Sequence, residues 1–97
     1  MGVVDANVTT QHLHHARSEL EDAVRTADDD EVRDALRETA GSFAGLAAGD
    51  RDADPAIVDG HLNVLRQARE EATGDTETKI DRALEYAEAY RKTLDTV

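Results

Sequence analysis

The chain has 97 residues, 22 of them acidic and 11 basic, which gives a formal net charge of −11. The arginines are interleaved with acids, so no basic patch suggests nucleic-acid binding. The absence of cysteine excludes disulfides, a thiolate nucleophile and cysteine metal sites. No apolar run approaches the ~20 residues of a membrane helix, and the start lacks the features of a signal peptide. We therefore expect one cytoplasmic domain, residues 1–97, that binds neither nucleic acid nor membrane.

The acidic composition also indicates the ionic strength of the solvent in which the protein works. The chain has 13 Asp to 9 Glu, and 9 Arg to only 2 Lys. At low salt the many acidic groups repel one another. At molar salt the Debye length falls to about 3 Å, and this repulsion is largely screened. Salt also strengthens apolar burial. The composition therefore indicates a halophilic protein in a salt-saturated cytosol, and the alternative is an ordinary acidic helical protein.

Residues 1–8 are expected to form a flexible lead-in, with Thr9 or Thr10 as the N-cap of a first helix. Apolar residues then recur at steps of three and four, which is the helical period. They are Leu13, Ala16, Leu20, Ala23, Val24 and Ala27. This pattern predicts a first helix that ends near Ala27.

The run Asp28-Asp29-Asp30 predicts a turn into a second helix over residues 31–48. Asp28 and Glu31 have the spacing of a capping box, with Asp28 as the cap. One uninterrupted helix is the alternative. In the second half of this segment, Gly41, Gly45 and Gly49 fall four residues apart. They predict either close approach of another backbone or fraying into a polar loop.

Asp54-Pro55 is the clearest boundary, because Asp caps a helix and Pro suits its first position. A third helix is predicted from there to about Ala72, and Gly74 suits the turn into a fourth helix that opens at Asp75 or Thr76. The residues expected to face inward are Ile57, Val58, His61, Leu62, Val64, Leu65, Ala68, Ile80, Ala83, Leu84, Ala87, Tyr90 and Leu94.

A repeat relates the two halves of the chain. His12–Ala23 and His61–Ala72 both read His-Leu, two residues, an apolar residue, Arg, three residues, two polar or acidic residues and Ala. The residues that follow also match, with one residue of slip, since Val32 corresponds to Ile80. The repeat predicts two helical hairpins, 9–48 and 54–96. The fold class is therefore all-α, a small antiparallel bundle of about four helices, either closed or an open array that dimerises.

The histidines are the first candidates for chemistry. His12 and His15 lie three residues apart on one helix, and His61 holds the place of His12 in the repeat. A pseudo-twofold axis would let His12 and His61 approach each other, with zinc or nickel as the natural ligand. The more ordinary interpretation makes each a half-buried boundary residue. His12, His15 and His61 are therefore weak metal candidates only, and no metal or other cofactor is expected.

The carboxylates provide a further enzymatic hypothesis. Glu19-x-x-Asp22 and Glu85-x-x-Glu88 superficially resemble the magnesium-binding pairs of helical nucleotide pyrophosphohydrolases, but their order differs and the doubled-Glu motif is missing. The Glu-x-x-His pattern of di-iron bundles is absent. No serine stands in a nucleophile elbow, and no phosphate-binding loop is present. We therefore expect no catalytic residues and a protein that is not an enzyme.

The His-Leu-x-x-Ala-Arg-x-x-Leu-Glu-Asp-Ala stretch and the Asp/Arg bias resemble the short acidic uncharacterised helical proteins of haloarchaea, which include a small hypothetical protein of Halobacterium. The resemblance implies a helical fold and a halophilic cytosol, with no activity to carry over. The thin core and the small-residue helix faces favour a non-enzymatic interaction or scaffold module that forms a homodimer or binds a protein partner. The alternatives are a metal- or small-ligand-binding regulator that uses the three histidines, and a magnesium-dependent hydrolase.

Overall fold

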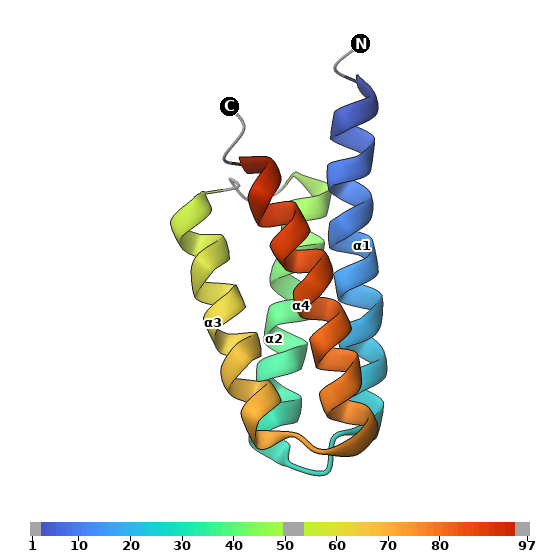
Figure 1. The fold of residues 1–97 in the computed structure, drawn as a ribbon, viewed down its shortest axis with the longest axis vertical. Coiled ribbons are helices and arrows are strands. Elements are labelled where there is room, and N and C mark those ends of the chain that lie inside the picture. The colour runs from blue at the N-terminus through green and yellow to red at the C-terminus, as the bar shows by residue number, and fades with distance from the viewer. Residues whose placement is uncertain (1–2, 50–53, 95–97) are drawn as a thin grey trace.

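The computed structural model describes residues 3–49 and 54–94, with side chains from residue 10 onward. It contains α1 (Val3–Thr26), α2 (Asp30–Ala48), α3 (Pro55–Glu71) and α4 (Gly74–Leu94). Successive helices run in opposite directions and lie side by side (Figure 1). The long axis of the molecule measures 44 Å, and the other two measure 21 and 20 Å. The all-α antiparallel bundle predicted from two hairpins is confirmed.

The four helices occupy the corners of a square. Helix α1 packs against α2 and α4, and α3 packs against the same two helices. Within the described ranges, α1 does not contact α3 and α2 does not contact α4, so these pairs lie on the diagonals. The α1–α4 interface is the most extensive and the α2–α3 interface the least. The bundle is closed, but one side of it is thinly packed.

The first helix starts earlier than predicted. Helix α1 already includes residues 3–8, so the expected lead-in 1–8 and the start at Thr9 or Thr10 are wrong for the described part. No Gly or Pro interrupts the segment from Val3 onward. Extension of an existing helix adds one hydrogen bond for each residue that is ordered. Val and Thr have only modest helix propensities, but this small cost does not prevent the helix from extending through them.

The break between α1 and α2 is confirmed, but its cap lies one residue later than predicted. Asp29, and not Asp28, is the N-cap, and its Oδ1 accepts hydrogen bonds from the backbone N–H groups of Glu31 (2.8 Å) and Val32 (3.3 Å). Arg33 fixes the turn, because its guanidinium donates to the Ala27 carbonyl at 2.8 Å. This contact orients the chain so that α2 begins at Asp30.

The start of α3 follows the expected chemistry, whereas α4 begins at Gly74 and not at Asp75 or Thr76. Asp54 caps α3 by accepting a hydrogen bond from the Ala56 N–H at 2.9 Å, and Pro55 occupies the first turn. Gly49 closes α2 in the left-handed conformation, with φ of 80°. Gly74 also has a positive φ, 61°, at the turn between α3 and α4. Both positions therefore require the conformational freedom of glycine.

The core is built mainly from Leu and Ala, with one Phe and one Tyr. Pairs related by the repeat are buried alike: Leu13 with Leu62, Val32 with Ile80. Its members are Leu13, Ala16, Leu20, Ala23, Ala27, Val32, Leu36, Ala40, Phe43, Leu46, Val58, Leu62, Leu65, Ala68, Ala72, Ile80, Ala83, Leu84, Ala87 and Tyr90. The repeated pattern thus records positions that face the bundle axis.

Two residues expected inside α3 lie outside. Ile57 is 51% exposed and Val64 is 40% exposed. Val58 and Leu65, each one position further along, are fully buried and define the inward line of the helix. Adjacent residues on a helix point about 100° apart. The predicted apolar face of α3 included both members of each adjacent pair, and it was therefore wider than the face that the helix buries.

Two glycines also differ from expectation. A methyl group at Gly41 or Gly60 would meet no atom of another element within 4 Å. Close approach of a neighbouring backbone, one of the two alternatives for Gly41, is therefore wrong at that position within this chain, and Gly60 of α3 likewise has open space around it. Gly41 instead faces outward on α2, on the side toward α1.

Candidate functional site

The histidines do not form one cluster. His61 of α3 is half-buried against Phe43 of α2, with ring centroids 5.8 Å apart and planes nearly perpendicular at 88°. His15 of α1 stacks on Tyr86 of α4 at 5.0 Å. His12 is half-buried on α1. Each of the two ring contacts joins a histidine to an adjacent helix.

His12 and His61, whose approach the repeat suggested, lie on helices that do not contact each other within the described ranges. A twofold along the bundle axis relates α1 to α3, which are diagonal helices without mutual contact. Within residues 3–49 and 54–94, no group of three or more His, Asp or Glu is placed to hold a metal ion.

One member of each acidic pair singled out in the sequence forms ion pairs with basic side chains. Asp22 accepts from Arg25 at 3.3 Å and lies 3.8 Å from Lys79 of α4. Glu88 pairs with Arg66 at 3.0 Å. Tyr90 follows expectation, because it is buried at 4% exposure, while Tyr86 is half-buried. Burial raises the pKa of the Tyr90 hydroxyl above its ordinary 10.0.

Ion pairs bridge the two helices of the second hairpin. Arg66 of α3 reaches Glu88 of α4 at 3.0 Å. Arg69 reaches Asp81 at 2.8 Å, and this hydrogen bond raises the pKa of the Arg69 guanidinium. Arg91 of α4 returns to Asp59 of α3 at 2.8 Å. The three contacts are exposed or partly exposed, so solvent screens them and each contributes little to the stability of the fold.

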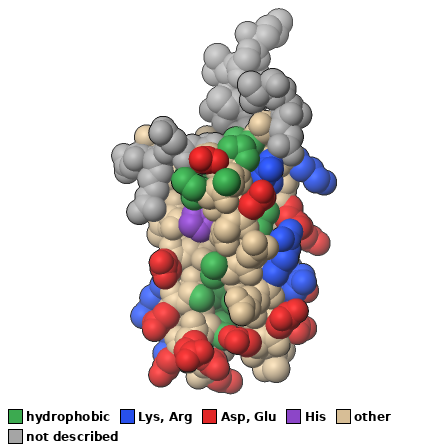
Figure 2. All heavy atoms as spheres, turned by 90° about the vertical axis from the view of Figure 1, so that its left-hand side faces the viewer, with side chains coloured by type: hydrophobic (Ala, Val, Ile, Leu, Met, Phe, Trp, Pro, Cys, Tyr) green, Lys and Arg blue, Asp and Glu red, His purple; other side chains and the backbone are tan. Residues whose placement is uncertain are grey.

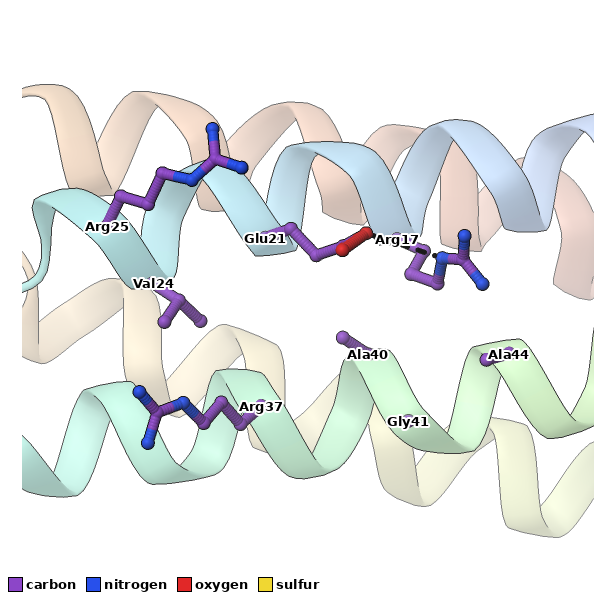
Figure 3. Close-up of a pocket in the computed structure, with 8 residues that line it drawn as sticks. All are labelled: Arg17, Glu21, Val24, Arg25, Arg37, Ala40, Gly41 and Ala44. Atoms are coloured by element: carbon purple, nitrogen blue, oxygen red, sulfur yellow. Dashed lines mark ion pairs between the residues drawn. The ribbon is translucent and has the colours of Figure 1, made fainter.

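The first hairpin contains an open groove of about 570 Å³ between α1 and α2, here called the arginine groove. It is lined by Arg17, Glu21, Val24, Arg25, Arg37, Ala40, Gly41 and Ala44. In Figure 3, Val24 and Ala40 point toward each other across the gap, and the guanidinium of Arg17 lies between the two helices. The sequence analysis did not single out this groove.

The charges of the arginine groove are not balanced across it. Arg17 pairs with Glu21 at 3.4 Å and Arg25 with Asp22 at 3.3 Å, both within α1. No ion pair joins α1 to α2 in the part of the chain that the structure describes, and Arg37 has no carboxylate at ion-pair distance there. The groove thus contrasts with the paired α3–α4 side.

A second surface lies over the weakest interface of the bundle. Ile57 and Val64, the large exposed hydrophobic residues of the described chain, lie seven residues apart on α3. Val64 also lines a shallow groove of about 250 Å³, together with Glu31, Val32, Ala35, Gln67, Ala68 and Glu71. We call Ile57, Val64 and this groove the α2–α3 face. Figure 2 views this side, with hydrophobic side chains along its middle and acids gathered at its lower end.

The fold and these surfaces define a small antiparallel four-helix bundle with open grooves between neighbouring helices. Its residues 8–93 match a family of unknown function, DUF7553, and the chain belongs to this family. No curated protein and no solved structure matches the chain. None of the helices, searched over the described residues, has the length and apolar character needed to cross a membrane.

Proposed function

We propose that this chain is a non-enzymatic helical interaction module of a halophilic cytosol, which forms a homodimer through the α2–α3 face. The observation that carries the proposal is the exposure of Ile57 (51%) and Val64 (40%) on one line of one helix. Seven residues span about 10.5 Å, close to two helical turns, so both side chains point the same way. Single exposed apolar residues are ordinary, whereas an aligned pair, one member of which lines a groove, suits a helix-to-helix contact.

The packing of the bundle supports the same face. The α2–α3 interface is the least extensive of the four. A second copy placed there would add apolar contacts where the monomer has fewest. A twofold contact brings the same patch of both copies together, so Val64 of one copy would meet the α2–α3 groove of the other.

The charges around the face make this contact dependent on salt. Glu31 and Glu71 line the groove and both are exposed. In a twofold dimer these carboxylates approach their counterparts, which costs free energy at low ionic strength. At molar salt the Debye length is about 3 Å and the repulsion is largely screened. The net charge of −11 also destabilises the folded monomer at low salt, because its acidic groups repel one another.

Light scattering after size-exclusion chromatography in about 2 M KCl tests the dimer. The wild-type chain should have the mass of two copies, and Val64→Glu should have the mass of one. Asn63→Glu is the matched control, because it adds the same charge at the neighbouring exposed position of α3 and should leave the dimer intact. A wild-type monomer, or equal behaviour of the two variants, would contradict the proposal.

The halophilic part is tested separately by thermal unfolding, followed by circular dichroism, from about 0.1 to 3 M KCl. The melting temperature should rise with salt, because screening reduces the self-repulsion of the net charge. A melting temperature that falls, or helical structure that is lost as KCl is added, would contradict adaptation to a salt-rich cytosol.

A further inference from the structure

We propose that the arginine groove between α1 and α2 binds an acidic helical segment of a partner protein. The repeat within the chain provides the comparison that carries this inference. Arg66 in the second hairpin corresponds to Arg17 in the first, and Ile80 corresponds to Val32. Glu88 lies eight residues after Ile80, and the residue eight after Val32 is Ala40.

The carboxylate that neutralises this arginine in one hairpin is therefore missing in the other. Arg66 reaches across to Glu88 at 3.0 Å. Arg17 has Ala40 at the equivalent position of α2, and it pairs instead with Glu21 of its own helix at 3.4 Å. The α1–α2 side thus lacks the carboxylate that spans the α3–α4 side.

The local charge is the reverse of the charge of the whole chain. Three arginines, Arg17, Arg25 and Arg37, line the groove with one acidic residue, Glu21. The Arg25 side chain is directed away from α2 (Figure 3). Arg25 also has Asp22 as a neighbour, while Arg37 has no carboxylate at ion-pair distance among the residues described. In a protein with a net charge of −11 this is a local cationic surface, and complementary charge selects acidic partners.

The shape of the groove indicates a segment and not a small anion. Arg17 and Arg25 lie eight residues apart on α1, which corresponds to about 12 Å along the helix. Acids seven or eight residues apart on a second helix match this spacing, whereas one phosphate cannot span it. Small-molecule sites bury most of their ligand, and this groove is open along its length (Figure 3).

The floor suits close approach of a helix. It consists of Val24, Ala40, Gly41 and Ala44, none larger than valine, and the outward side of Gly41 is open space. An amphipathic helix that lays its apolar side in such a floor and its acids on the rim uses a common mode of peptide recognition. This binding is independent of self-association, because it uses the α1 side of α2 and not the α3 side.

Fluorescence anisotropy tests the inference with two labelled synthetic helices in about 0.5 M KCl. One peptide has a leucine stripe flanked by glutamates, and the other has glutamine at every glutamate position. The wild-type chain should bind the glutamate peptide about tenfold more tightly than the glutamine peptide. Two rim ion pairs at the upper end of the usual range would account for such a factor. Absence of binding, or equal binding of the two peptides, overturns the proposal.

Variants locate the binding. The double variant Arg17→Gln/Arg37→Gln should bind the glutamate peptide about fivefold more weakly or worse. Arg82→Gln is the matched control, because Arg82 is exposed on α4 away from the groove, and it should change affinity less than about twofold. Ala40→Glu places a carboxylate of this chain where the second hairpin has Glu88, so it should also weaken binding of the peptide. Val64→Glu changes the α2–α3 face and should leave peptide binding unchanged. Circular dichroism confirms that each variant is folded.

Two further outcomes overturn the proposal. Binding that survives in Arg17→Gln/Arg37→Gln places the peptide elsewhere. A dimer that dissociates on Arg37→Gln but not on Val64→Glu assigns the arginine groove to a second copy of this chain. If neither the wild type nor Val64→Glu forms a dimer, the proposed self-association is contradicted, but the result of the peptide experiment still stands.

Discussion

The contact between Phe43 and His61 offers the sharpest test of how the bundle is held together. Phe43 is the only phenylalanine of the chain and is fully buried. Its ring meets that of His61 edge to face at 5.8 Å, across the thinly packed α2–α3 interface. If His61 packs against Phe43, its removal should destabilise the chain more while Phe43 is present than after Phe43 has been replaced.

The magnitudes are set by burial. Phe43→Ala would cost about 3–5 kcal/mol, a large part of the roughly 5–15 kcal/mol that stabilises a domain of this size. Phe43→Leu retains most of the volume and should cost about 1–1.5 kcal/mol. An edge-to-face ring pair contributes about 0.5–1.5 kcal/mol beyond area burial. We expect about 0.5–1 kcal/mol of coupling between positions 43 and 61, because imidazole is the smaller ring.

The assay is a double-mutant cycle by urea unfolding in about 2 M KCl, followed by circular dichroism. The variants are Phe43→Leu, His61→Ala and the combination. His14→Ala is the control, because His14 is exposed on α1 and its loss should change stability by less than about 0.5 kcal/mol. A coupling below about 0.3 kcal/mol would refute the packing role. Zinc that stabilises the wild type but not His61→Ala would instead show that His61 is a ligand.

Two further predictions concern the backbone and pH. Gly41→Ala should raise the free energy of unfolding by up to about 1 kcal/mol, since this helical position has open space around it. Gly49→Ala should lower the free energy of unfolding by about 1–2 kcal/mol, because the φ of Gly49 is 80°. Equal effects of the two substitutions in urea unfolding would contradict this reasoning. Burial raises the pKa of Tyr90 above 10.0, so the unfolded chain loses this proton first and stability should fall as pH rises through 10 toward the folded pKa. Tyr90→Phe should lose less stability between pH 8 and about 10.5, and an identical loss would show that another group is responsible.

Much of the secondary structure could be predicted from local chemistry. The Asp54-Pro55 cap and the break after Ala27 depend on backbone groups within a few residues of each side chain, so they are readable in the sequence. The start of α1 was missed because no strong signal marks it: a helix without Gly or Pro extends until its ends fray. The shift of the cap from Asp28 to Asp29 was missed for a related reason, since three consecutive aspartates are equally good caps.

The sites were less accessible to prediction. The histidines drew attention as residue types, yet His15 and His61 turn out to contact rings on neighbouring helices. The arginine groove was overlooked although its signal was present, because Ala40 stands where the second hairpin has Glu88. Recognising it required knowing which residues face each other across each hairpin, and that knowledge comes from the packed helices.

The sequence by itself determined four helices, two hairpins and an acidic chain, because periodicity, caps and composition are local or additive properties. The tertiary structure alone decided that Ile57 and Val64 lie outside, that α1 and α3 are diagonal, and that no carboxylate of α2 pairs with an arginine of α1 among the described residues. The helical period identifies a stripe but not its width. The rotation of each helix, which fixes that width and every cross-helix contact, is set jointly by all four helices as they fill one core.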